Sequence, residues 1–109
     1  MSWREQIEQE LAKAATGLRE GNDGLARVCA RRAVALGAQA WVKRGSRKVW
    51  PADAMNQLRK IQEEEAFPLW VKEAAQRLLT KVTQRDQAPV STDPIADARL
   101  ILTHLDQLT

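Results

Sequence analysis

The sequence lacks most of the residues on which enzymes commonly depend for chemistry. Its 109 residues include one cysteine, Cys29, one histidine, His104, and no tyrosine. A single cysteine cannot close a disulfide within the chain, and absence of disulfides is typical of the reducing cytoplasm. There is no glycine-rich phosphate loop, and no Cys/His cluster of zinc-ligand spacing. We therefore expect a cytoplasmic protein without metal or other cofactor, in which Cys29 is a small buried residue.

Long apolar runs and strand patterns are missing as well. No segment approaches the ~20 apolar residues of a membrane span. The opening MSWREQIEQE has no apolar run behind a basic start, so no secretory signal is expected. Apolar and polar residues nowhere alternate in the sustained way of a half-buried strand. With a length that suits one domain, the chain is predicted to form one all-α domain over residues 1–109, away from membranes.

Apolar residues instead recur at steps of three and four, which is the spacing of amphipathic helices. Gly21 suits the end of the first helix and Asn22 suits the start of the second. Prolines at 51, 68 and 94 suit the first turns of three later helices. The predicted helices cover residues 3–19, 24–44, 51–65, 68–83 and 94–108. Because most connections are short, we predict a five-helix antiparallel bundle with two long N-terminal helices.

The second predicted helix has a face of small residues and a weaker apolar stripe elsewhere. The small residues are Ala26, Ala30, Ala33, Gly37 and Ala40. They allow a neighbouring helix to approach closely. The second stripe consists of Val28, Ala35 and Val42. A helix that is apolar on two sides is contacted from two sides, and a second copy of the chain is the simplest second contact. We therefore predict a homodimer.

Positive charge is concentrated in the middle of the chain. Residues 19–60 carry ten basic and three acidic side chains, a net charge of +7. The candidate binding residues are Arg27, Arg31, Arg32, Lys43, Arg44, Arg47 and Lys48. Helical periodicity predicts that the first three lie on the outer side of their helix. We predict a basic surface for an acidic protein or RNA, the alternative being a merely solvated face.

Two tryptophans, Trp41 and Trp50, flank the basic segment. An exposed indole beside basic side chains can stack on a nucleobase. The chain has four tryptophans and one phenylalanine as its only large aromatic residues. A core of this size needs them, so we expect both indoles to be core anchors.

The last predicted helix contains the only combination that suggests catalysis, Arg99 and His104. Histidine suits general acid–base work, and arginine can stabilise the charge that develops on a phosphate. Five residues along a regular helix correspond to a rotation of about 140°. The two side chains therefore lie on opposite flanks of the apolar face. They can share one target only if the helix is distorted or a dimer joins two flanks.

One segment resembles a known family. AKAATGLREGNDGLARVCARRAVALGAQAWVKRG, residues 12–45, is similar to the first half of HEPN domains, which are small prokaryotic helical bundles. The last helix of that family often carries Arg-x4-6-His, which Arg99 and His104 match. The resemblance implies a helical bundle that pairs with a nucleotidyltransferase protein or acts as a ribonuclease or toxin across a dimer. Leu100 departs from the pattern, since a polar residue commonly follows the motif arginine.

These observations lead to two function predictions from different classes. The first is a non-enzymatic interaction module, homodimeric, that presents a helical surface and its basic residues to a partner. The alternative is a HEPN-type ribonuclease or toxin-like protein that uses Arg99 and His104 across a dimer.

Overall fold

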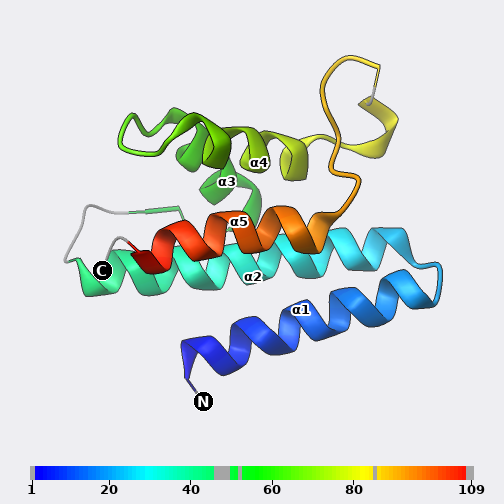
Figure 1. The fold of residues 1–109 in the computed structure, drawn as a ribbon, viewed down its shortest axis with the longest axis horizontal. Coiled ribbons are helices and arrows are strands. Elements are labelled where there is room, and N and C mark those ends of the chain that lie inside the picture. The colour runs from blue at the N-terminus through cyan, green and yellow to red at the C-terminus, as the bar shows by residue number, and fades with distance from the viewer. Residues whose placement is uncertain (1, 46–49, 52, 85, 108–109) are drawn as a thin grey trace.

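The computed structural model describes residues 2–45, 50–51, 53–84 and 86–107. The helices are α1 (Trp3–Arg19), α2 (Asp23–Arg44), α3 (Ala54–Glu63), α4 (Leu69–Leu79), the short 3-10 helix η1 (Val82–Gln84) and α5 (Pro94–Gln107). No strand occurs within these ranges. The predicted all-α architecture, with two long helices first, is confirmed (Figure 1).

The helices are arranged around α2. Helices α1 and α2 form an antiparallel hairpin, and α5 lies along α2 beside it (Figure 1). Helices α3 and α4 pack on each other, with α3 against α2 and α4 against α5. Both α1 and α5 pack on α2, yet they touch each other over only a small area. None of the described helices combines the length and apolar character needed to cross a bilayer.

The α1–α2 turn forms as its sequence predicts. Gly21 has a φ of 74°, in the left-handed region that glycine adopts without strain. The Asn22 side chain accepts a hydrogen bond of 3.1 Å from the Leu25 amide and so caps α2. At the other end of α1, the Ser2 hydroxyl caps the helix by accepting from the Glu5 amide. Local sequence signals therefore mark both ends of α1 and the start of α2.

The small residues of α2 permit close packing, as predicted. Ala30 and Ala33 are fully buried within one core cluster that also draws on α3, α4 and α5, and Ala26 and Ala40 are buried as well. Gly37 leaves room for the Leu102 side chain of α5, because a Cβ atom at this position would clash with Cδ2 of Leu102. Replacing this glycine would therefore move α5 or turn the leucine aside.

Helices α3 and α4 are shorter than their predicted ranges. Helix α3 begins after Asp53 instead of at Pro51, and Pro68 precedes α4 without belonging to it. Helix α4 ends at Leu79, after which Thr80 is extended. Only the third proline, Pro94, opens a helix as predicted, and Asp93 caps it by accepting from the Ala96 amide at 3.1 Å.

A polar cluster holds the connection between α4 and α5 in place. Arg77 on α4 forms a bidentate contact with the Asp97 carboxylate on α5, with distances of 2.8–3.2 Å. The buried Ser91 hydroxyl donates to the same carboxylate at 2.6 Å, and its amide donates to the Arg77 carbonyl at 3.0 Å. Hydrogen bonding to Asp97 raises the pKa of Arg77. This cluster satisfies a nearly buried carboxylate and ties two helices to the connecting segment.

Candidate binding groove between α1 and α5

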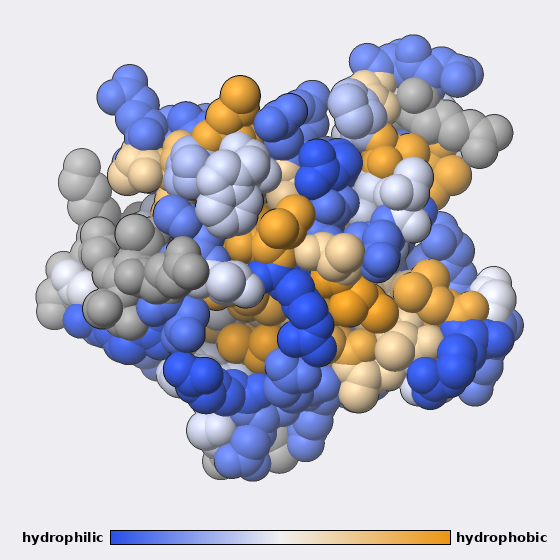
Figure 2. Space-filling model, viewed as in Figure 1, coloured by the Kyte–Doolittle hydropathy of each residue, from blue (hydrophilic) through white to orange (hydrophobic). Residues whose placement is uncertain are grey.

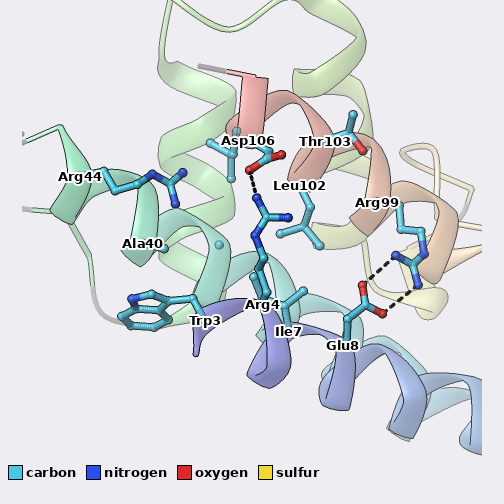
Figure 3. A pocket seen from close by; sticks show the side chains of 12 residues that line it. Trp3, Arg4, Ile7, Glu8, Ala40, Arg44, Arg99, Leu102, Thr103 and Asp106 are labelled. Carbon is cyan, nitrogen blue, oxygen red and sulfur yellow. Dashed lines mark hydrogen bonds and ion pairs between the residues drawn. The ribbon is translucent and has the colours of Figure 1, made fainter. Parts of the chain in front are cut away.

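A groove lies between α1 and α5, where side chains of both helices meet over α2. Its volume is about 350 Å³. Its apolar floor is made by Ile7 of α1, Gly37 of α2, and Leu102 and Leu105 of α5 (Figure 3). In the space-filling view, apolar atoms show between α1 and α5 and are crossed by strongly hydrophilic side chains (Figure 2). The groove forms because α1 and α5 each pack against α2 but make little contact with each other.

Two ion pairs bridge the groove from wall to wall (Figure 3). Arg4 of α1 donates from Nη2 to Oδ1 of Asp106 on α5 at 3.0 Å. Arg99 of α5 donates from both terminal nitrogens to the Glu8 carboxylate on α1, each at 3.2 Å. The side chains are 54–82% exposed, so solvent screens both pairs and each contributes little stability.

One end of the groove carries excess positive charge. Arg44, at the end of α2, lines the groove and forms no ion pair within the described ranges. Next to it in sequence, Lys43 places its ammonium 5.2 Å from the centre of the Trp3 ring, a cation–π contact. These two cations also complement the negative end of the α2 dipole. Arg44, from the predicted basic segment, and Arg99 therefore line one groove, with Lys43 beside it.

His104 lies away from this groove. Its ring packs edge-on against Phe67 and Trp70, with ring centres 5.6 Å and 5.5 Å apart. Its Nε2 atom is buried and has no hydrogen-bond partner among the described residues. Arg99 faces α1, whereas His104 faces the segment that begins α4. The structure therefore does not bring these two predicted catalytic residues together within one chain, and their joint role would need a second copy.

The predicted outer position of Arg27 and Arg31 is wrong. Arg27 is paired with Asp23 at 2.6 Å, and its side chain is only 13% exposed. Arg31 is half-buried and donates from Nε to the Leu78 carbonyl at 2.8 Å, which satisfies a carbonyl at the end of α4. Burial, and secondarily the charge of Arg27, lower the pKa of Arg31. Arg31 therefore links α2 to the end of α4, whereas the ion pair of Arg27 lies within α2.

The remaining basic residues are placed differently. Arg32, Lys43 and Arg44 are exposed. Arg32 lines a separate hollow between α1 and α2, together with the largely buried Glu10. Arg47 and Lys48 lie outside the described residues. The predicted basic surface therefore does not form one continuous patch over the described part of α2.

The tryptophans lie as expected. Trp41 is buried, and its ring meets Trp50 at 5.4 Å and Phe67 at 5.4 Å. Trp50 packs against the same core. Both indoles therefore pack as core anchors, Trp41 buried and Trp50 partly buried.

The structure also shows the surroundings of Cys29 and of the second apolar stripe of α2. Cys29 is buried, and its pKa is raised by burial and by the nearby Glu10. In the second apolar stripe, Val42 packs against the core of its own chain, whereas Val28 remains 39% exposed.

Among the described residues, no group of three or more His, Cys, Asp or Glu side chains is close enough together to hold a metal ion.

Sequence reasoning missed most of the groove. Its α1 residues, Arg4, Ile7 and Glu8, carry no motif. A signal was nevertheless present, because Arg4 and Glu8 are one turn apart on α1 and Arg99 and Asp106 are two turns apart on α5. Opposite charges on two helices predict ion pairs between those helices only once it is known that the helices lie side by side.

Comparison of the chain with models of known families, with curated proteins and with solved structures finds no match. The resemblance to HEPN domains therefore rests on the sequence pattern and on the shared helical character.

Proposed function

We propose that this chain is a non-enzymatic interaction module whose α1–α5 groove binds an acidic segment of a partner protein. The observation that carries the proposal is the combination of an apolar floor with arginine-bearing walls. Apolar floors with charged rims are the usual construction of surfaces that receive an amphipathic helix. The apolar floor would bury apolar side chains of the partner, and the charged walls would fix the partner's orientation.

Charge favours an acidic occupant. The groove and its end carry four cations, Arg4, Lys43, Arg44 and Arg99, and two carboxylates, Glu8 and Asp106. Four minus two leaves a local charge of +2. Arg44 is the strongest anchor, because no ion pair within the described ranges has to be broken before it binds a carboxylate. Complementary charge of this kind speeds association and rejects basic partners.

The floor favours protein over RNA. RNA recognition of single strands depends on open aromatic faces for base stacking. Lys43 lies over the Trp3 ring, and Trp41 is buried in the core. Aliphatic side chains such as Ile7 and Leu102 form the floor instead. These side chains suit the leucine and isoleucine face of a helix better than a nucleobase.

The test uses a fluorescent amphipathic peptide of about 16 residues, long enough for four helical turns. It carries leucine along one face and glutamate beside it, and a control peptide carries lysine in place of glutamate. We expect the acidic peptide to bind and the basic peptide not to bind. Arg44→Gln should weaken binding by about two- to five-fold, the scale of one exposed charge contact.

Arg32→Gln is the matched control for Arg44→Gln, because both are exposed arginines of α2 and only Arg44 lines the groove. Equal weakening by both variants would show attraction by general positive charge and contradict a groove site. A single-stranded oligouridine that competes with the acidic peptide at equal affinity would contradict the protein-partner assignment.

Self-association is a separate part of the proposal. Leu25 and Val28 are neighbours on α2 and remain 41% and 39% exposed. An apolar pair at the surface of a helix suits contact with a second copy, and a two-fold dimer would use the same pair from both chains. The ribonuclease alternative depends on such a dimer, because Arg99 and His104 of one chain face opposite sides.

A further inference from the structure

The two ion pairs across the α1–α5 groove are reciprocal. Helix α1 supplies a cation, Arg4, and an anion, Glu8, whereas α5 supplies the anion Asp106 and the cation Arg99. Each wall therefore presents one cation that is occupied by a carboxylate of the opposite wall (Figure 3). Because the walls hardly touch otherwise, these pairs are the main polar link between α1 and α5 in the described structure.

We propose that binding works by carboxylate exchange: carboxylates of the partner replace Glu8 on Arg99 and Asp106 on Arg4. The partner is then an α-helix with two acidic residues two turns apart and apolar residues between them. This inference rests on the proposed function and adds the identity of the partner's contacting face.

The spacing follows from α5. Arg99 and Asp106 are seven residues apart on this helix, which corresponds to a rise of about 10 Å. The two ion pairs are therefore anchored two turns apart on the α5 wall, although their partners Arg4 and Glu8 are one turn apart on α1. A helix that runs along α5 presents residues i and i+7 at this separation on one face, with i+3 and i+4 between them. The pattern Glu-x-x-Leu-Leu-x-x-Glu places two carboxylates at the bridges and two leucines over the floor.

Exchange is favourable because the existing pairs are weak. All four side chains are more than half exposed, so releasing Glu8 to water costs little. The same contacts become more protected from water once a helix covers them, and an ion pair strengthens as its surroundings become less polar. The arginines remain paired throughout, so no charge is left buried alone.

Two variants separate exchange from a purely structural role. Glu8→Gln and Arg99→Gln both remove the same ion pair, one from each side. Under exchange, Glu8→Gln frees Arg99 and strengthens peptide binding by roughly two- to five-fold, whereas Arg99→Gln removes an anchor and weakens it by a similar factor. Net charge alone would also shift the two variants in opposite directions, so Glu20→Gln and Arg32→Gln, which make the same charge changes at exposed residues outside the groove, measure that effect. A pair that merely shapes the groove would give shifts no larger than those of the two controls, or shifts of one sign.

The experiment measures anisotropy of the labelled Glu-x-x-Leu-Leu-x-x-Glu peptide with wild type and both variants. A permuted peptide of the same composition carries its second glutamate at i+5, off the binding face. We expect the permuted peptide to bind more weakly and the two variants to shift affinity in opposite directions. Shifts of the same sign would overturn exchange while leaving groove binding intact. Equal binding of both peptides would overturn the spacing, and no binding of either peptide to any of the three proteins would overturn the proposed function as well.

Discussion

Arg99 and His104 lie on opposite flanks of α5: the Arg99 guanidinium bridges to Glu8 of α1, and the His104 ring rests between Phe67 and Trp70. The rotation of about 140° between positions five residues apart explains this arrangement. Arg99 therefore belongs to the groove, whereas His104 belongs to the aromatic packing beside α4.

Separate roles predict separate consequences for these two residues. His104→Ala should lower the free energy of unfolding by about 1 kcal/mol, because two ring contacts are lost. It should leave acidic-peptide affinity unchanged. Arg99→Gln should weaken peptide binding and change stability by less than about 0.5 kcal/mol, because its ion pair is exposed. Urea denaturation and fluorescence anisotropy measure the two effects. RNA cleavage that His104→Ala abolishes would contradict this division and support the ribonuclease alternative.

The Arg77–Asp97 pair should be the most sensitive polar contact in the fold. Asp97→Asn keeps the shape of the side chain but removes its charge, and it leaves Arg77 and Ser91 with a weaker acceptor. We expect a loss of about 2 to 4 kcal/mol in the free energy of unfolding, on the scale of breaking a buried pair. Arg4→Gln, which breaks an exposed pair, is the matched control and should cost less than about 1 kcal/mol. Similar losses for both variants would be inconsistent with this assignment.

Cys29 should resist alkylation in the folded protein. Burial blocks access, and burial together with Glu10 raises the pKa of the thiol, so less reactive thiolate is present at neutral pH. Iodoacetamide labelling should therefore be slow in buffer and fast in urea. Glu10→Gln removes one cause of the raised pKa without uncovering the sulfur, so the folded protein should stay protected. Fast labelling without denaturant would show that the α1–α2 contact opens readily.

Two glycines of α2 should respond oppositely to alanine. At Gly37 a new Cβ atom would clash with the end of the Leu102 side chain, which lines the groove and must shift. We expect Gly37→Ala to reduce peptide binding and to destabilise the fold by about 1 to 3 kcal/mol. A Cβ atom at Gly24 meets no atom closer than 3.9 Å, so Gly24→Ala should be neutral or stabilise by about 0.5 kcal/mol. Unchanged peptide affinity for folded Gly37→Ala would count against Leu102 as part of the floor.

Self-association should depend on the exposed pair Leu25 and Val28. Analytical ultracentrifugation at micromolar concentration should show a species larger than the 12.3 kDa chain. Val28→Glu should shift the protein towards that single-chain mass, because two like charges would face each other across a two-fold axis. If the wild-type protein sediments only as a single chain, the dimer prediction is wrong. The ribonuclease alternative then loses its basis, because it needs Arg99 and His104 from two chains.

Local features of the sequence predicted local features of the fold. Gly21, Asn22 and Pro94 define helix ends because their preferences act within one turn of chain. Periodicity predicted the five helices for the same reason. The early end of α4 escaped prediction, since Thr80 leaves the helix where Ser91, eleven positions further on, bonds back to Arg77.

The groove could be predicted only in part, because it depends on which helices meet. A helical wheel placed Arg31 on the outside, but the end of α4 reaches that side and the Leu78 carbonyl accepts a hydrogen bond from the Arg31 guanidinium. The helical wheel correctly predicted that Arg99 and His104 lie on opposite flanks, because both residues belong to one helix. It could not pair Arg99 with Glu8, which is 91 positions away.

Mapping the acidic peptide onto the protein by ¹⁵N chemical shifts tests the central claim most directly. The account predicts that the Glu-x-x-Leu-Leu-x-x-Glu peptide perturbs amide signals along the groove, at Ile7, Gly37 and Leu102, and the side-chain signals of Arg44 and Arg99. Signals around Arg32 and His104 should stay in place. Perturbations centred on Arg32, or a saturating titration that leaves the groove signals unmoved, would contradict a binding site between α1 and α5.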